Sequence, residues 1–344
     1  MHGKVRVGIV GAGYWGPNLI RNFVQLDESD VVVVADKRDD RLQHIRKTYP
    51  HVRTTSDYRD FFNMGLDAVV IATPPTTHYA IAKDCLEHGL HAFVEKPITT
   101  CARDAEELIK IAAARGLRLM VGHIFEYNAA VRKVKEIIDS GELGDIYYIN
   151  AVRVNLGLYQ PHLNVLWDLA PHDLSILLYL LGQEPISVTA QGGDRVFEGI
   201  HDIAYMHLTF PNKVLAHVHV SWLDPNKERK ITIVGSKKML VYDDIEPMDK
   251  IKIFDKGVEA PPYTDTYADF QCSYRYGDIT TPRLDLVEPM REECQHFIRS
   301  IVKGFTPQSD GRVGLQVVKL LEMADRSLQN GGLKEKQAQN MGLA

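Results

Sequence analysis

The segment KVRVGIVGAGYWG (Lys4–Gly16) decides the fold of the first part of the chain. Its β-branched start predicts a buried strand, the glycines predict a tight turn, and apolar residues at helical spacing follow over 19–23. In this context Gly11 permits the turn, Gly13 lets the backbone approach a pyrophosphate, and Gly16 lets the helix pack on the strand. The segment therefore predicts a dinucleotide-binding unit.

A carboxylate stands where such a unit binds ribose. The apolar run Val31–Ala35 predicts a second strand, and it ends at Asp36, 20 residues after Gly16. A carboxylate there accepts hydrogen bonds from both ribose hydroxyls and repels a 2′-phosphate, which favours NAD over NADP. Lys37 and Arg38 weaken this preference, because a cation beside the ribose can accommodate the extra phosphate. We expect NAD as the cofactor, with NADP less favoured.

Strand and helix patterns alternate up to residue 122, which predicts a doubly wound parallel sheet. Three further strands end at Thr73-Pro74, at Glu95-Lys96-Pro97 and at Gly122-His123. Ligands of such sheets bind beyond the carboxyl ends of the strands. We therefore expect these strand ends to lie along one edge with the dinucleotide, and a lysine there can be catalytic. We also expect a cis peptide bond between Lys96 and Pro97.

The second half of the sequence predicts an α+β domain. A helix over 127–140, a strand over 146–154 and a long apolar helix from residue 167 precede several strand-like runs between 186 and 254, which predict a large, mostly antiparallel open sheet. The polar, aromatic segment 261–283 is expected to be a loop over a ligand or a partner subunit. Two helices, over 286–303 and 312–330, finish the chain. We predict a Rossmann domain over 1–122 and a substrate-binding and oligomerisation domain over 123–344.

Asp168 and His172 are four residues apart on the long apolar helix, so they point to the same side near its N-terminal end. Both side chains are costly to bury unless they are satisfied. They therefore either cap and pack locally or face a cleft, and these residues alone leave both interpretations open. His217 and His219 share one face of a strand, where a solvated or interface face is expected rather than a metal site.

Composition excludes several classes of protein. A formal net charge of −5 gives no basic surface for nucleic acid, so no nucleic-acid partner is expected. No apolar run approaches the ~20 residues of a membrane span, and no signal region opens the sequence, so we expect a cytoplasmic protein without a membrane partner. The four cysteines lack CxxC spacing and are expected to be reduced packing residues, not metal ligands.

The combination of motifs resembles the glucose-fructose oxidoreductase, inositol dehydrogenase and MocA family (Gfo/Idh/MocA), and the resemblance spans nearly the whole chain. Its carriers are the glycine turn, Ala72-Thr73-Pro74, Glu95-Lys96-Pro97 and the Asp168/His172 pair. The resemblance implies an NAD(P)-dependent sugar dehydrogenase. It assigns to His172 the role of base, to Asp168 that of orienting His172 or passing the proton on, and to Lys96 the stabilisation of alkoxide charge. The expected cofactor contacts are Gly11, Gly13, Tyr14, Trp15, Gly16, Asp36, Lys37, Thr73, Pro74, His78, Glu95 and Lys96.

Within the family, residues 13–19, 122–128 and 152–159 look like the branch that acts on nucleotide-activated amino sugars. This implies NAD-dependent oxidation of the 3-hydroxyl of a UDP-sugar, UDP-N-acetylglucosamine (UDP-GlcNAc), to a 3-keto sugar used in amino-sugar biosynthesis. The expected substrate contacts are His123, Arg153, Asn155, Tyr159, His162, Asn164 and His172. The alternatives are a family dehydrogenase for inositol, a free sugar or a UDP-uronic acid, and a non-catalytic dinucleotide-binding regulator. A homodimer or homotetramer formed through the C-terminal sheet is expected.

Overall fold

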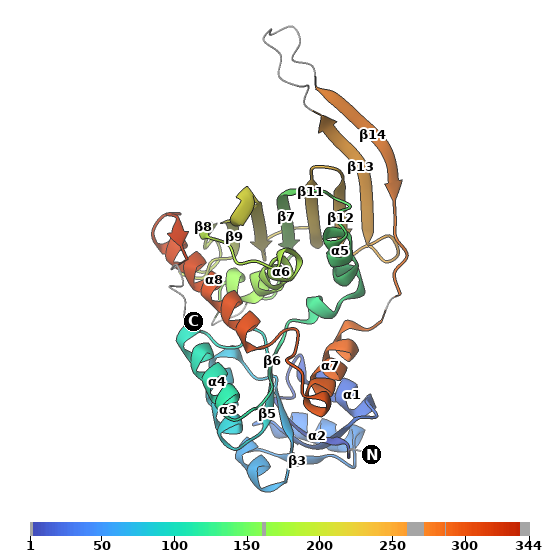
Figure 1. Cartoon of the computed structure of the whole chain (residues 1–344). Helices are drawn as coiled ribbons and strands as arrows, with labels where there is room; N and C mark the ends of the chain where they lie inside the picture. The colour runs from blue at the N-terminus through green and yellow to red at the C-terminus, as the bar shows by residue number, and fades with distance from the viewer. Residues whose placement is uncertain (1–2, 160–162, 260–271, 286, 338–344) are drawn as a thin grey trace. The chain divides into compact units, whose positions relative to one another are not determined.

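The computed structural model of the chain describes residues 3–159, 163–259, 272–285 and 287–337 and contains two compact units (Figure 1). The first unit comprises Met1–Asn128 and Val287–Glu322, and the second comprises Ala129–Leu286 and Met323–Ala344. This division differs from the predicted one in two places. The first unit continues to Asn128 instead of ending at 122, and it also includes a segment from near the C-terminus.

The first unit has the predicted doubly wound architecture. Its strands are all parallel and lie in the order β3-β2-β1-β4-β5-β6, so the order reverses between β1 and β4. The strands are β1 (Val5–Val10), β2 (Ser29–Ala35), β3 (Arg53–Thr55), β4 (Ala68–Ile71), β5 (His91–Glu95) and β6 (Leu119–Gly122). The connecting helices are α1 (Gly16–Gln25), α2 (Asp39–Thr48), α3 (Pro75–Glu87) and α4 (Ala102–Ala114), with the short 3₁₀ helices η1 (Tyr58–Asn63) and η2 (Ile124–Tyr127).

Helix α7 (Pro289–Lys303) belongs to the first unit because its apolar face completes that unit's core. Phe297 of α7 lies edge-on to Phe23 of α1 and Phe93 of β5, with ring centroids 6.4 and 5.7 Å apart. Farther along, the backbone N–H of Val121 donates to the carbonyl of Ser309 over 2.8 Å. An amphipathic pattern shows that a helix has an apolar face but not which core it fills, so the sequence did not reveal this placement. The division between the units falls within α8 (Gly311–Gln329).

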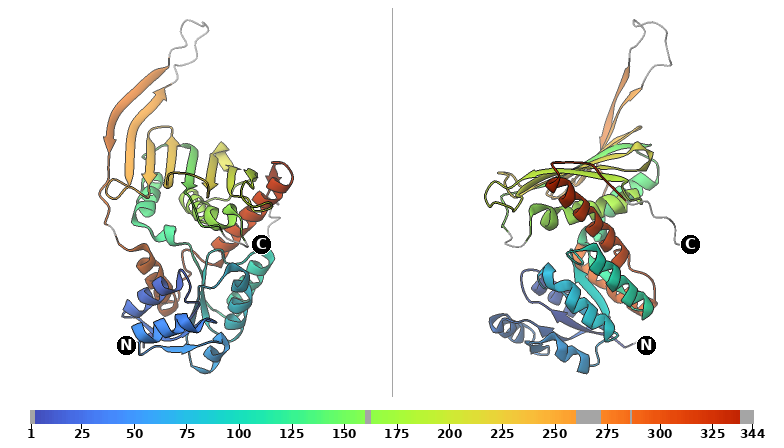
Figure 2. Two further views of the ribbon diagram at one scale, coloured as in Figure 1. Left: turned by 180° about the vertical axis from the view of Figure 1, so that it is seen from behind. Right: turned by 90° about the vertical axis from the view of Figure 1, so that its left-hand side faces the viewer.

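The second unit is built on a nine-stranded sheet in the order β14-β13-β12-β11-β7-β10-β9-β8-β15. Only the β7/β10 pair is parallel among these neighbours, so the predicted mostly antiparallel open sheet is confirmed. Helices α5 (Ala129–Asp139) and α6 (Val165–Leu181) lie on one side of this sheet (Figure 2). The strands are β7 (Ile146–Val154), β8 (Ser187–Gly193), β9 (Ile203–Thr209), β10 (Leu215–Ser221), β11 (Glu228–Gly235), β12 (Met239–Asp243), β13 (Ile251–Glu259), β14 (Ser273–Thr280) and β15 (Glu335–Lys336).

The register separates the two faces of this sheet. Ala151, Val218 and Ile231 are buried in adjacent strands on the face that packs against α6, and the alternate residues form the outer face. On the outer face Tyr205 stacks on His219 with ring centroids 4.3 Å apart. His217 lies on the same face as His219, as predicted, and within the described residues no cluster of three metal-ligating side chains occurs.

One predicted loop is in part a strand. The expectation of an irregular segment over 261–283 is wrong for Ser273–Thr280, which forms β14 and pairs with β13. The residues of β14 are mostly polar or aromatic and mostly exposed, so this strand lacks the apolar alternation that marks a half-buried strand. The remainder of the predicted loop from 261 to 271 lies outside the described residues. No helix in the described part of the chain is long and apolar enough to cross a membrane.

Candidate active site

The glycine turn after β1 has the close packing that its sequence requires. Gly11 has φ +99°, and a Cβ there would lie 2.5 Å from the carbonyl oxygen of Ala72. A Cβ on Gly16 would lie 2.2 Å from the carbonyl oxygen of Gly11. Side chains are therefore excluded at both positions, and the N-terminus of α1 directs backbone N–H groups towards the turn. These residues fit the pyrophosphate of a dinucleotide. Tyr14 and Trp15, 83% and 41% exposed, extend from the same turn.

The carboxylate of Asp36 lies beside this turn, as predicted. Its Oδ2 accepts a hydrogen bond from the backbone N–H of Ala12 over 2.7 Å, and its Oδ1 accepts one from the backbone N–H of Arg38 over 2.9 Å. The guanidinium of Arg41 lies 3.2 Å from Oδ2, an ion pair that the sequence analysis did not identify. Lys37 is exposed beside them. Asp36 is thus held in place by backbone donors at the edge where a ribose is expected.

The ends of β4 and β5 lie on neighbouring strands of the sheet and carry Thr73, Pro74 and Lys96. The Lys96–Pro97 peptide bond is cis, as predicted. His78, in the first turns of α3, has its two ring nitrogens 2.8 Å from the carbonyl oxygens of Pro97 and Thr73. His78 therefore links the two loops, and its expected contact with the cofactor stays a prediction.

Two titratable residues, the half-buried Glu95 and the buried His123, interact electrostatically with Lys96. Burial raises the pKa of Glu95 to about 7, although the positive charge of Lys96 acts to lower it. The Glu95 carboxyl packs against Gly122: a Cβ on this glycine would lie 3.1 Å from Cδ of Glu95. Burial and, to a smaller extent, the Lys96 charge lower the pKa of His123 to about 3. His123 is 1% exposed, and neither ring nitrogen has a hydrogen-bond partner within the described residues. A neutral imidazole and a readily protonated carboxyl thus accompany the lysine.

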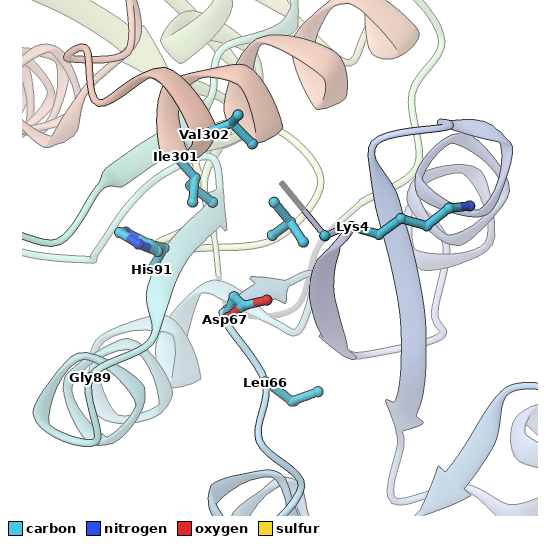
Figure 3. A pocket seen from close by; sticks show the side chains of 9 residues that line it. Lys4, Leu66, Asp67, Gly89, His91, Ile301 and Val302 are labelled. Atoms are coloured by element: carbon cyan, nitrogen blue, oxygen red, sulfur yellow. The ribbon is translucent and has the colours of Figure 1, made fainter. Parts of the chain in front are cut away.

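A pocket of about 380 Å³ in the first unit lies at the opposite edge of the sheet (Figure 3). Its lining includes Lys4 at the start of β1, Asp67 just before β4 and His91 at the start of β5. Ligands of open α/β sheets bind at the carboxyl ends of the strands. None of the predicted site residues lines this pocket, and we assign it no part in the chemistry.

Helix α6 presents Asp168 and His172 one turn apart, both half-buried on a helix whose neighbouring positions are mostly buried. The indole Nε1 of Trp222 donates to Oδ2 of Asp168 over 3.1 Å, which fixes the carboxylate. Asn164 caps the helix: its Oδ1 accepts from the backbone N–H of Trp167 over 3.2 Å. The amide group of Asn164 also donates to Asp325, so this residue has a structural role, and its contact with substrate stays a prediction.

The loop after β7 is held against the same tryptophan. The backbone N–H of Gly157 donates to the carbonyl of Trp222 over 2.9 Å, and the ring centroid of Tyr159 lies 5.1 Å from that of Trp222. The Tyr159 hydroxyl donates to the buried Asp202 over 3.2 Å. Trp222 thus brings Tyr159 close to Asp168, although the sequence analysis singled out neither Trp222 nor Asp202. Asn155 begins this loop, and the predicted contact His162 lies outside the described residues.

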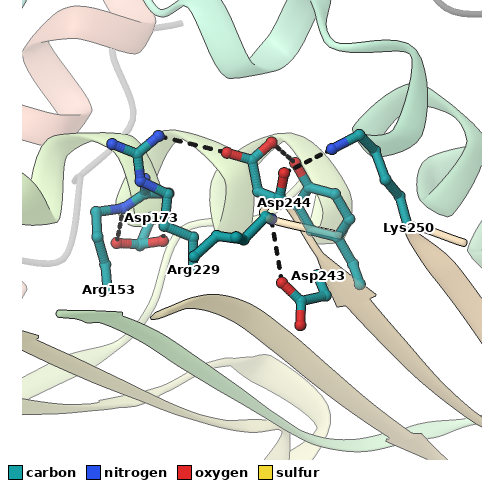
Figure 4. Close-up of polar contacts among 8 residues, drawn as sticks. Arg153, Asp173, Arg229, Asp243, Asp244 and Lys250 are labelled. Atoms are coloured by element: carbon teal, nitrogen blue, oxygen red, sulfur yellow. Dashed lines mark hydrogen bonds and ion pairs between the residues drawn. The ribbon is translucent and has the colours of Figure 1, made fainter. Parts of the chain in front are cut away.

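Arg153 forms a buried ion pair with Asp173 of α6 (Figure 4). Its Nε and Nη2 donate to the two carboxylate oxygens over 2.8 and 3.0 Å, and the two side chains are 6% and 2% exposed. Arg229 and Asp244 form a second, more exposed pair nearby. A two-bond pair of this kind ties α6 to the sheet one residue beyond His172. The substrate contact expected of Arg153 stays a prediction.

The comparisons with known proteins agree with this architecture. The oxidoreductase family model with an NAD-binding Rossmann fold (Gfo/Idh/MocA) matches residues 5–123, and the C-terminal domain model of the same family matches residues 131–241. The chain is 27% identical to the UDP-N-acetylglucosamine 3-dehydrogenase of Acidithiobacillus ferrooxidans over 75% of this chain and 79% of the relative. It is 22% identical to the myo-inositol 2-dehydrogenase of Thermotoga maritima over 94% and 96% of the two chains.

A solved structure shares the fold across almost the whole length. The WlbA dehydrogenase of Bordetella pertussis, in complex with NADH and UDP-GlcNAcA, superimposes with a TM-score of 0.79 at 24% identity and covers 98% of this chain and 100% of its own. Two family models that succeed one another along the chain, together with relatives of matching length, leave one conclusion. The chain belongs to the Gfo/Idh/MocA family of NAD(P)-dependent oxidoreductases.

Proposed function

We propose that the protein oxidises the 3-hydroxyl of UDP-GlcNAc to the 3-keto sugar with NAD as the oxidant. The observation that carries the proposal of a dehydrogenase is the pair of half-buried titratable residues, Asp168 and His172, one turn apart on the otherwise buried α6. Support for the substrate comes from the relative that is a UDP-N-acetylglucosamine 3-dehydrogenase and from a solved relative bound to a UDP-sugar.

The proposed chemistry divides the oxidation between three residues. The glycine turn and Asp36 would hold NAD, which would supply the acceptor for the hydride that leaves C3 of the sugar. His172 takes the proton from the 3-hydroxyl, because imidazole is the side-chain base suited to neutral pH. Asp168, fixed by Trp222, orients His172 or passes the proton on. The ammonium group of Lys96 stabilises the negative charge that develops on the reacting oxygen.

Two other functions remain as alternatives. The similarity to a myo-inositol 2-dehydrogenase over nearly the whole chain favours an inositol dehydrogenase. A dehydrogenase for a free sugar or a UDP-uronic acid would use the same three residues. A non-catalytic dinucleotide-binding regulator would have no use for a base. The presence of Lys96, Asp168 and His172 together argues against that second alternative.

Purified protein incubated with UDP-GlcNAc and NAD tests the proposal. We expect NADH absorbance to rise and the sugar to lose the mass of two hydrogen atoms. A parallel sample with 2-oxoglutarate as acceptor covers the case in which the enzyme retains NADH. Turnover of myo-inositol or a free sugar, with none of UDP-GlcNAc in either sample, would reject the proposed substrate.

Asp36 should set the preference for NAD over NADP. Replacing Asp36 by alanine removes the acceptor for the ribose hydroxyls and the charge that repels a 2′-phosphate. We expect the ratio of Kd for NADP to Kd for NAD to fall by about tenfold or more, because a hydrogen bond to a charged group contributes about 1.5–3 kcal/mol. Fluorescence titration measures both constants. The control is Asp30→Ala, which removes an exposed carboxylate near the start of β2, at the other end of this strand from Asp36. An unchanged ratio in Asp36→Ala would contradict the assignment.

We infer that copies of the chain associate through the outer face of the nine-stranded sheet. Leu215, Tyr148 and Tyr205 lie on this face and are 53%, 46% and 38% exposed, which is a large apolar area to leave in water. Light scattering should give the mass of a dimer or tetramer, and Leu215→Glu should shift it towards the monomer. Leu333→Glu, at an exposed leucine outside the strands, is the control. A monomeric wild-type protein would contradict this inference.

A further inference from the structure

His78 connects two loops that leave neighbouring strands. Its Nδ1 lies 2.8 Å from the carbonyl oxygen of Pro97 and its Nε2 lies 2.8 Å from that of Thr73. Thr73 follows β4, and Pro97 follows Lys96 at the end of β5. The side chain is 1% exposed, so solvent does not compete for these contacts. One buried ring therefore spans the loop on which Lys96 stands and the loop beside it.

The two carbonyls determine what this ring can do. A carbonyl oxygen only accepts, so each contact is a hydrogen bond only when the facing nitrogen carries a proton; a neutral imidazole has one such nitrogen and an imidazolium has two. Burial lowers the pKa of His78. The contacts with the two carbonyls act in the other direction, because they favour the charged form of the ring. In either protonation state the ring therefore donates to at least one of the two carbonyls. Removing the ring would leave a buried carbonyl without a donor, at a cost of about 1–3 kcal/mol.

The loop after β4 has independent supports, whereas the tie to Pro97 comes from His78. The Thr77 hydroxyl, one residue before His78, donates to the carbonyl of Pro74 over 2.7 Å. On the other side the carbonyl of Ala72 packs against Gly11 of the glycine turn. Without His78 the β4 loop keeps these contacts, whereas the carbonyl of Pro97 loses the contact that ties it to that loop. The Lys96 N–H, which donates to Oε2 of Glu95 over 3.2 Å, and the buried Ile98 remain in place, so the expected displacement is small and local.

We propose that His78 is the positioning residue of Lys96: it holds the carbonyl of Pro97 in a fixed relation to that of Thr73 and so fixes the backbone from which the Lys96 side chain extends. The inference rests on the proposed function in that Lys96 is taken to stabilise the reacting oxygen. Both ring nitrogens of His78 face backbone carbonyls, so the ring acts on Lys96 through the backbone. Its effect on rate arises because a misplacement of ~1 Å in a catalytic group costs about a hundredfold.

Two variants separate the ring from its hydrogen bond. His78→Phe removes both nitrogens and keeps a ring of similar size in the buried space, and His78→Gln keeps one donor. His88→Gln is the matched control, because His88 lies at the end of the same helix and is exposed. Its Nδ1 contacts a carbonyl of its own helix, and its ring stacks on Phe62 with centroids 3.7 Å apart, so neither contact involves the loop that carries Lys96. Three quantities are measured: the trace-acetylation rate of Lys96 relative to the exposed Lys47 by mass spectrometry, the Kd for NAD, and kcat for sugar oxidation.

For His78→Phe we expect the relative labelling rate of Lys96 to change by about threefold or more and kcat to fall by about ten- to a hundredfold, while the Kd for NAD changes by less than about threefold. His78→Gln should show both changes at smaller size, and His88→Gln should match the wild type. Unchanged labelling of Lys96 in a folded His78→Phe protein would overturn the proposal, whatever its activity.

Circular dichroism checks that each variant is folded. If His78→Phe does not fold, the test rests on His78→Gln. Wild-type labelling of Lys96 and wild-type kcat in His78→Gln would then overturn the proposal. The labelling measurement needs no sugar. It therefore tests the link between His78 and Lys96 even if UDP-GlcNAc is not the substrate. If the labelling of Lys96 changes but UDP-GlcNAc is not oxidised, the result counts against the proposed function and not against the role of His78.

Discussion

Lys96→Ala is expected to lower kcat for sugar oxidation by about 10²–10³-fold, the usual loss when one group that stabilises a developing oxyanion is removed. Lys96 directly follows β5, at the carboxyl edge of the sheet, where ligands of doubly wound sheets bind. Affinity for NAD should change by less than about threefold, because we assign the main contacts with the pyrophosphate and ribose to the glycine turn and Asp36.

Lys110→Ala is the matched control, since Lys110 is an exposed lysine on α4 of the same unit. Steady-state rates measured with saturating NAD give kcat, and fluorescence titration gives the Kd. Wild-type kcat in Lys96→Ala would remove Lys96 from the chemistry. A large loss of NAD affinity at unchanged kcat would leave Lys96 only its expected contact with the cofactor.

His172→Ala is expected to lower kcat/KM by about 10²–10⁴-fold, the range for loss of a general base. In the wild type, protonation of a histidine base should lower kcat/KM towards acid pH. This fall should disappear in His172→Ala, because the base that would be protonated is absent. Added imidazole should restore part of the rate, since the substitution leaves a space beside Asp168 on α6. The pH profile with and without imidazole checks all three expectations.

His44→Ala, an exposed histidine of α2, is the control for histidine loss as such. A retained acid limb in His172→Ala would show that another group takes the proton. Asp168 would be the first candidate, because it lies one turn earlier on the same helix and its position is fixed by Trp222.

The elements around the candidate site follow local rules, and these the sequence predicts well. The glycine turn needs backbone conformations and close approaches that side chains exclude, and the chain has glycine at both crowded positions, Gly11 and Gly16. Strand β7 begins and ends where its apolar run does. The strand ends of the first unit follow from alternation, because a parallel sheet brings the carboxyl ends of its strands to one edge.

What the sequence did not reveal depends on partners distant in the chain. Arg153 is a plausible anion ligand by residue type, yet it is neutralised by Asp173, 20 residues later. Asn164 is polar and stands next to α6 because it caps that helix. Such pairings arise only when separate elements pack together, and neither composition nor periodicity encodes which side chains will meet. The membership of α7 in the first unit has the same origin.

One isotope experiment tests the central proposal most directly. UDP-GlcNAc carrying deuterium at C3 is incubated with NAD and the wild-type protein, and both products are analysed by mass spectrometry. We predict that deuterium appears on the reduced nicotinamide and that the sugar product has lost it. Reduced cofactor without deuterium would show that another carbon is oxidised, and no reduction of NAD in the presence of an acceptor, alongside turnover of myo-inositol, would contradict the proposed function.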